Sequence, residues 1–95
     1  MLQPDIPLTG GISEGLRVAT LAEAHGAALC PHSLPELHVH LVAAAKAGSY
    51  VESFPLLDDL LQEPLQASGG LMRPPDQPGH GILWSAEALE RYRVR

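Results

Sequence analysis

The chain has 95 residues, of which 45% are hydrophobic and 18% charged, and its formal net charge at pH 7 is −5. That length allows at most one small domain, and this composition favours a folded soluble chain over a disordered one. The six Lys and Arg form no basic stripe, and no apolar stretch approaches the roughly 18 to 20 residues of a membrane span, so we expect neither nucleic acid nor a membrane as a partner.

The single cysteine, Cys30, lies inside a short apolar run. It offers no disulfide framework and does not indicate an oxidising compartment, so we expect it to be a small buried hydrophobe. The N-terminus lacks the charged region and following apolar segment that are typical of a secretion signal. We therefore expect a cytoplasmic location.

Extended and helical segments alternate in the first half of the chain. Residues 1–5 have the shape of the end of a strand, which implies that part of this strand lies upstream. The spacing then predicts a helix over 13–25, a strand over 27–30, a helix over 34–46 and a strand over 50–54. Such alternation implies parallel strands joined by right-handed crossovers, and so predicts a piece of an α/β sheet or barrel.

The first predicted helix has signals at both ends. Ser13 is the expected N-cap, Glu14 in the first turn suits the helix dipole, and Gly26 supplies a left-handed residue after the last turn. The expected apolar stripe consists of Val18, Leu21 and Ala22, flanked by Leu16 and Ala19.

The second predicted helix follows a break in the chain at Pro31. Ser33-Leu34-Pro35-Glu36 has the form of a capping box with a proline in the first turn, which predicts a helix start. Lys46 suits the last turn and Gly48 is expected to end the helix. Its expected apolar face consists of Leu37, Leu41 and Ala44, widened by Val42 and Ala45.

The second half of the chain is less regular. Residues 56–68 predict an irregular segment with one helical turn, closed by Gly69-Gly70, and 73–79 predict an extended, proline-rich surface loop. A short extended piece over 81–84 follows. Ser85 then caps a predicted final helix over 86–92.

Three titratable residues fall at the ends of successive predicted strands: Asp5, His32 and Glu52. Because adjacent parallel strands lie about 4.8 Å apart, side chains at the same end can touch. A carboxylate that accepts from one ring nitrogen of His32 would fix its tautomer and leave the other nitrogen free to remove a proton. The alternatives are ordinary: Asp5 as a turn residue, His32 as a helix-entry residue and Glu52 as a solvent-facing strand residue.

A zinc site is the rival interpretation of the histidines. His32, His38 and His40 could ligate a metal together only if 38–40 were extended, because residues two apart share a face on a strand but diverge by about 200° on a helix. The predicted helix therefore leaves His38 and His40 as packing or surface residues. We predict no metal ligands in this chain.

Several short motifs occur in an order and spacing that resembles the C-terminal quarter of enolase-superfamily proteins of the mandelate racemase/muconate lactonizing enzyme family, in particular the mandelate racemase subgroup. The resemblance covers nearly the whole chain. The motifs that carry it are Gln3-Pro4-Asp5, Gly10-Gly11-Ile12, Leu21-Ala22-Glu23-Ala24-His25-Gly26, Pro31-His32, Glu36-Leu37-His38-Val39-His40-Leu41, Tyr50-Val51-Glu52 and Pro78-Gly79-His80-Gly81.

This resemblance implies a modified TIM-type (β/α) barrel with an α+β capping domain. Residues 1–55 would be the last βα units of the barrel, and residues 56–95 a segment that returns to the capping domain. The family's Mg²⁺ ligands would lie on earlier barrel strands that this chain does not contain. The chain would then need the missing N-terminal part, or self-association, to be complete.

The resemblance also implies roles for the three candidate residues. Asp5 and His32 match the family's Asp–His dyad, whose histidine is the base at the carbon next to a carboxylate, and Glu52 matches the residue that hydrogen-bonds the substrate carboxylate. Enolase-superfamily sites use a Lys or His base with Mg²⁺. Leu8 stands where some relatives carry a lysine, which favours acid-sugar dehydration over mandelate racemisation.

Two functional hypotheses follow. The chain is part of a Mg²⁺-dependent dehydratase or racemase that acts on a small hydroxy or sugar acid, inactive by itself because the metal ligands are missing. Alternatively, it is a free-standing, non-catalytic module that keeps a piece of the barrel and binds a partner through its open edge.

Overall fold

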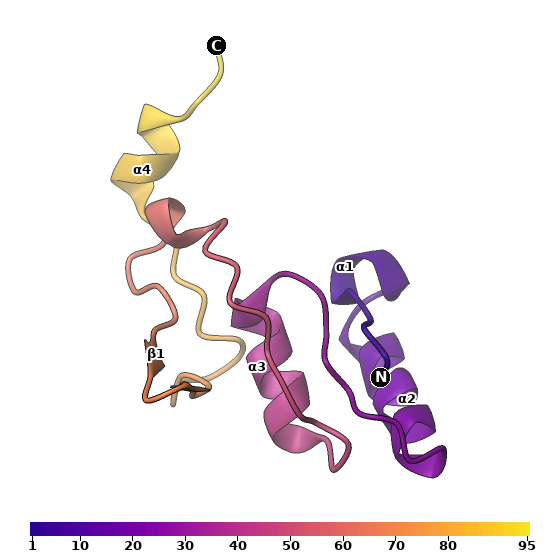
Figure 1. Ribbon diagram of the computed structural model, residues 1–95. Coiled ribbons are helices and arrows are strands. Elements are labelled where there is room, and N and C mark those ends of the chain that lie inside the picture. The colour runs from indigo at the N-terminus through magenta and orange to yellow at the C-terminus, as the bar shows by residue number, and fades with distance from the viewer.

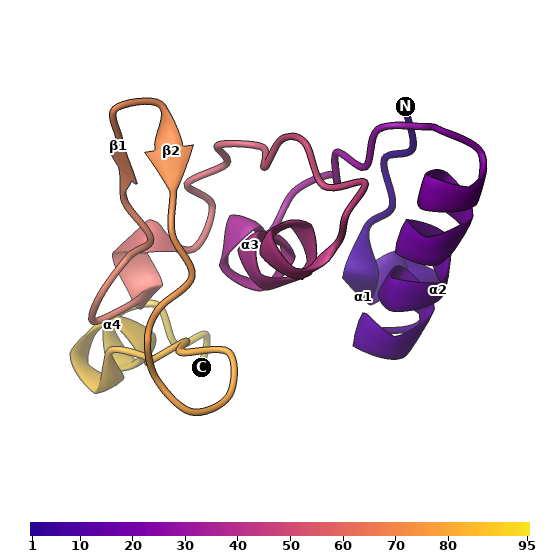
Figure 2. The ribbon, with the colours of Figure 1, turned by 90° about the horizontal axis from the view of Figure 1, so that it is seen from below.

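The computed structural model describes all 95 residues and has extents of 47 × 32 × 23 Å. Three helices make up its N-terminal half, and a small hairpin and a fourth helix lie beyond the third helix (Figures 1 and 2). The elements are α1 (Ile6–Thr9), α2 (Ile12–Ala24), α3 (Pro35–Ala44), the 3-10 turn η1 (Asp58–Leu60), β1 (Ala67–Ser68), β2 (Leu71–Met72) and α4 (Ala86–Arg91).

Three extended segments pair in parallel in the N-terminal half. Leu29 is the middle member, with a parallel bridge to Leu2 on one side and to Gly48 on the other. On the first side the pairing continues to the end of the segment, where the His32 N–H donates to the carbonyl of Pro4 at 3.0 Å. The predicted parallel arrangement is therefore present, as isolated bridges rather than long strands.

The third segment pairs earlier in the chain than predicted. The expected strand over 50–54 is wrong: the last hydrogen bond of this pairing runs from Ser49 N–H to the Leu29 carbonyl at 3.1 Å. The next donor on the middle segment would be residue 31, and Pro31 has no N–H. The strand-forming residue types after Ser49 therefore have no partner, and β propensity without a partner makes no strand.

The short helix α1 was not predicted, and it changes the start of α2. Gly10 and Gly11 form the turn between α1 and α2, with φ of 103° and 99°. Gly11, not Ser13, is the N-cap of α2, because α2 begins one residue before Ser13. The predicted end is confirmed, since α2 stops at Ala24 and Gly26 is left-handed with φ of 60°.

Small residues form the buried face of α2, so the predicted stripe is partly wrong. Gly15, Ala19 and Ala22 are buried, whereas Leu21 is 56% exposed and Leu16 is 48% exposed. Small side chains allow close packing: a Cβ on Gly15 would lie 3.2 Å from side-chain carbons of both α1 and α3. The core cluster that results consists of Ile6, Ala19, Ala22, Leu29 and Leu41.

The helix α3 lacks the predicted capping box. Leu34 is its N-cap, no side chain caps it, and both Ser33 and Leu34 are left-handed, with φ of 64° and 32°. The carboxylate of Glu36 is buried without a hydrogen-bond partner. In a capping box Glu36 would accept from the Ser33 N–H, but here this N–H donates to Glu52 instead.

The C-terminal end of α3 also differs from the expectation. The helix ends at Ala44, and the Lys46 ammonium pairs with Glu23 at 3.0 Å. Gly48 is not a left-handed terminator. It is needed because a Cβ at this position would collide with backbone carbonyl oxygens at the end of α3, those of Val42 and Ala45.

The second half confirms the helical turn and the final helix. η1 is the single turn expected in 56–68, and the Ser85 Oγ accepts from the Ala88 N–H at 3.2 Å to cap α4. The antiparallel β1–β2 hairpin around Gly69-Gly70 was not predicted. None of the helices combines the length and the hydrophobicity that a membrane-spanning helix requires.

We expect Leu29→Ala to lower the free energy of unfolding by about 2 to 5 kcal/mol, because Leu29 is fully buried at the centre of the core cluster. Urea denaturation of the chain measures this change. Leu71→Ala is the matched control, because Leu71 is 64% exposed and its truncation should change stability by less than about 0.5 kcal/mol. Equal effects of the two substitutions would contradict this assignment of the core.

Candidate active site

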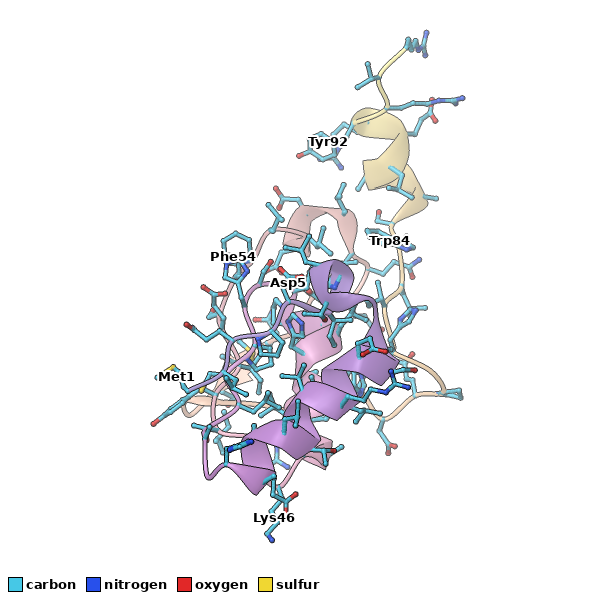
Figure 3. All side chains as sticks on the ribbon, turned by 90° about the vertical axis from the view of Figure 1, so that its right-hand side faces the viewer. Met1, Asp5, Lys46, Phe54, Trp84 and Tyr92 are labelled. Atoms are coloured by element: carbon cyan, nitrogen blue, oxygen red, sulfur yellow. The ribbon has the colours of Figure 1, made fainter.

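The three predicted site residues follow the three parallel segments and lie at the same end of them. The Oδ2 of Asp5 is 3.2 Å from the Nδ1 of His32, and the Ser33 N–H donates to the Oε2 of Glu52 at 2.5 Å. Figure 3 shows Asp5 between Tyr92 and Lys46, well away from Lys46, which follows the C-terminus of α3. The contact expected between Asp5 and His32 is therefore present, and the adjacent residue Ser33 connects it to Glu52.

The Asp5–His32 contact fixes one nitrogen of the imidazole. A carboxylate only accepts, so Nδ1 of His32 carries the hydrogen and donates it to Asp5. The side chain of Asp5 is 15% exposed and that of His32 is 61% exposed. The Nε2 of His32 has no hydrogen-bond partner, so this nitrogen is available to a molecule approaching from solvent.

The start of α1 leaves the Asp5 carboxylate free for this contact. Asp5 is the N-cap of α1, a position where an aspartate normally accepts a backbone N–H of the first turn, yet its side chain makes no cap bond. Pro7 has no N–H, and the N–H groups of Leu8 and Thr9 donate to the carbonyl of Asp5 at 3.0 and 2.8 Å. The remaining N–H, that of Ile6, donates to the Nε2 of His38 at 3.0 Å.

The loop between His32 and α3 is held on both sides of Ser33. Glu52 accepts from the Ser33 N–H, and the Nδ1 of His38 donates to the Ser33 carbonyl at 2.5 Å. Left-handed backbone at a residue other than glycine costs roughly 1 to 3 kcal/mol. These hydrogen bonds offset that cost at Ser33. The direction of the chain just after His32 is therefore set by side chains from two other segments.

His38 is a site residue that the sequence interpretation missed. It was expected to be a packing or surface residue, and it is fully buried, with both ring nitrogens bonded to backbone groups. Its position in a helix gave no signal of the bond from Ile6, which lies 32 residues earlier in the chain. His40 lies on the same helix and binds only the His80 carbonyl, at 3.0 Å.

A hollow of about 260 Å³ lies beside these residues. Glu52 and the buried Cys30 line it, whereas Asp5 and His32 do not. The wall of the hollow consists of Met1, Gln3, Cys30, Pro31, Tyr50, Val51 and Glu52. This chain by itself therefore does not enclose the dyad.

No three His, Cys, Asp or Glu side chains come together in a way that could hold a metal ion. His38 and His40 lie on a helix rather than on an extended segment, so the geometry that a shared zinc site needs is absent. The residues of this chain do not fit a Mg²⁺ site.

A family model described as enolase C-terminal domain-like matches residues 1–88. Among curated relatives, the L-talarate/galactarate dehydratase of Salmonella typhimurium is 40% identical over 87 residues, which are 92% of this chain and 22% of that protein. The 3,6-anhydro-alpha-L-galactonate cycloisomerase of Streptomyces coelicolor is 34% identical over 93 residues, 97% of this chain and 26% of that protein. The chain thus spans about a quarter of the length of the curated relatives it matches.

Solved structures show the same similarity. L-talarate dehydratase from Polaromonas sp. JS666, complexed with Mg and L-glucarate, superposes with a TM-score of 0.86 at 42% identity over 94% of this chain and 25% of that one. An enolase from alpha proteobacterium bal199 with bound Mg superposes with a TM-score of 0.90 at 31% identity over 96% of this chain and 25% of that one. The chain therefore has the fold of the matching part of these proteins.

We expect the Asp5–His32 contact to contribute little to stability, because His32 is largely exposed. A double-mutant cycle of Asp5→Asn and His32→Gln should give a coupling free energy of about 0.5 kcal/mol. Urea denaturation of the four chains measures it, with the exposed Glu14–Arg17 pair as the matched comparison. A coupling of more than about 2 kcal/mol would mark the pair as a structural ion pair instead.

Proposed function

This chain belongs to the enolase C-terminal domain-like family, and on that premise we propose that it carries the acid–base residues of an enzyme that removes the proton next to the carboxylate of a sugar acid. The observation that carries the proposal is the 3.2 Å contact between Asp5 and His32, which leaves Nε2 of His32 free. Sugar acids are proposed because dehydratases of L-talarate, galactarate and L-rhamnonate are among the relatives.

The proposed chemistry begins at the Nε2 of His32. This nitrogen takes the proton from the substrate carbon as a general base, and returns a proton as a general acid where the reaction requires it. Asp5 holds the ring in the tautomer with hydrogen on Nδ1 and stabilises the imidazolium that forms. Both tasks need the carboxylate beside Nδ1, where Asp5 lies.

Glu52 is proposed to bind the substrate carboxylate. The Ser33 N–H holds one carboxylate oxygen of Glu52, Oε2, which leaves Oε1 for the substrate. Removing a proton next to a carboxylate adds negative charge to the substrate, so a hydrogen bond donated by protonated Glu52 would be stronger in the transition state than before it. The hollow lined by Glu52 gives this interaction room.

The metal of such an enzyme is assigned to parts of the barrel that this chain does not contain. Mg is present in the structures of relatives named above, and the side chains of this chain assemble no metal site. When bound, Mg²⁺ would supply charge stabilisation to the carboxylate oxygens of the substrate. Residues 1–55 are proposed to be the last βα units of that barrel and residues 56–95 the segment that returns to the capping domain.

The small core supports the need for a further protein surface. Only 16 of the 95 residues are buried, and large apolar side chains such as Leu8 and Leu21 are exposed. We propose that the rest of the barrel, or a second copy of the chain, covers them. The alternative function, a non-catalytic binding module, is less well supported because it makes no use of the Asp5–His32 contact.

We expect the chain alone to catalyse no exchange of the proton next to the carboxylate of L-glucarate, because it holds no metal site. NMR spectroscopy in D₂O with Mg²⁺ present detects incorporation of deuterium at that carbon. Incorporation that disappears in His32→Asn would contradict the division of the site between two parts of the enzyme.

We expect activity once the missing part is supplied. The chain is grafted in place of the matching segment of the Salmonella typhimurium dehydratase, to which it is 40% identical, and deuterium exchange into L-talarate and galactarate is measured. His32→Asn and Asp5→Asn should each lower kcat by roughly 10²- to 10⁴-fold, because they remove the base and its orienting partner.

The control for this hybrid enzyme is His25→Asn, since His25 is exposed at the C-terminus of α2. It should leave kcat unchanged. A hybrid that catalyses no exchange, or one that keeps most of its turnover in Asp5→Asn, would contradict the proposed function.

A further inference from the structure

We propose that His38 is a positioning residue that holds Asp5 and His32 in contact, an inference that rests on the function proposed above. His38 touches neither residue through its own polar atoms. Its ring binds the backbone of Ile6, directly after Asp5, and of Ser33, directly after His32. It therefore links the ends of the two segments that carry the dyad.

The two backbone partners fix the protonation state of the His38 ring. A backbone N–H only donates, so the Nε2 that accepts from Ile6 carries no hydrogen. A backbone carbonyl only accepts, so the Nδ1 beside the Ser33 carbonyl carries the hydrogen. The ring is thus a neutral imidazole in one tautomer, buried without any contact with solvent.

The bond from Ile6 determines what the Asp5 carboxylate does. The N–H of Ile6 is the one donor in the first turn of α1 that the backbone does not satisfy, since Pro7 has none and the next two bind the Asp5 carbonyl. Because His38 accepts from Ile6, no donor of α1 competes for the Asp5 side chain. The carboxylate can then serve His32.

The bond to Ser33 determines where His32 lies. The left-handed backbone of Ser33 and Leu34 turns the chain sharply between His32 and α3. His38 holds the carbonyl of Ser33, while Glu52 holds its N–H. A histidine that only filled space in the core could bind any buried polar groups. His38 binds the two backbone groups that directly follow Asp5 and His32.

The first measurement is the tautomer of each ring, obtained from two-bond ¹H–¹⁵N NMR correlations of the 95-residue chain. We expect His38 and His32 both to carry hydrogen on Nδ1, in contrast to the Nε2–H form that a solvated imidazole prefers. A His38 ring with hydrogen on Nε2, or with the averaged signals of a solvated ring, would overturn the proposal. No substrate is needed, so this result is independent of whether the proposed activity is found.

Three substitutions separate the two bonds of His38. Glutamine places a polar group near the position of Nε2 and can keep the bond from Ile6. Asparagine places one near Nδ1 and can keep the bond to Ser33. Leucine removes both bonds at similar volume, so its buried backbone partners are left unsatisfied.

We expect His38→Leu to lower the fraction of His32 with hydrogen on Nδ1 by roughly twofold or more, because Asp5 is no longer held beside it. His38→Gln should retain more of this form than His38→Asn. Only glutamine can still accept from the Ile6 N–H, so that this donor does not compete for the Asp5 carboxylate. His40→Leu is the matched control on α3 and should leave His32 unchanged, because His40 binds only the His80 carbonyl. If His38→Leu does not fold, the Gln and Asn variants decide: equal His32 tautomers in the two would overturn the proposal.

The hybrid enzyme described above gives a second readout. A positioning role predicts that His38→Asn lowers kcat by roughly 10- to 100-fold while KM changes little, because the base is displaced but the substrate contacts remain. His38→Gln should recover part of the loss. Unchanged kcat in His38→Asn would overturn the proposal, whereas a hybrid inactive even with His38 would contradict the proposed function and leave the tautomer result standing.

Discussion

The parallel pairing of three short segments around Leu29 is the constraint on which the rest of the structure depends. In parallel pairing the ends of neighbouring segments lie side by side. Here the hydrogen bond from the His32 N–H to the Pro4 carbonyl extends the pairing to the residue before Asp5. Asp5 and His32 come from positions 27 residues apart, and no local interaction could bring them together. The candidate dyad is therefore a direct result of register.

The candidate site lies where residues depart from their usual capping and backbone preferences. Asp5 occupies an N-cap position without capping, and Ser33 and Leu34 adopt left-handed backbone although neither is glycine. Bonds from α3 and from the third segment satisfy the backbone groups involved. Departures of this kind are expected at functional sites, because a side chain committed to a cap or a helix turn is not free for chemistry.

This chain contains only some of the groups that the proposed reaction requires. It carries a candidate acid–base pair and a carboxylate next to a hollow, but no group of side chains that could hold a metal. It also leaves many large apolar side chains exposed around a five-residue core. Both observations are expected of a structural unit that spans about a quarter of its relatives' length and shares their fold.

The sequence by itself determined the positions of the helices α2, α3 and α4, the end of α2 at Gly26 and the cap of α4 at Ser85, because nearby residues decide each of these. Its motifs also identified the family and the three candidate residues. Only the tertiary structure decided the loop at Ser33, the early end of the third segment's pairing opposite Pro31 and the bonds of the buried His38. The loop at Ser33 and one bond of His38 depend on partners 19 and 32 residues away, and the end of the pairing depends on a proline in a different segment. Neither periodicity nor propensity contains information on such long-range contacts.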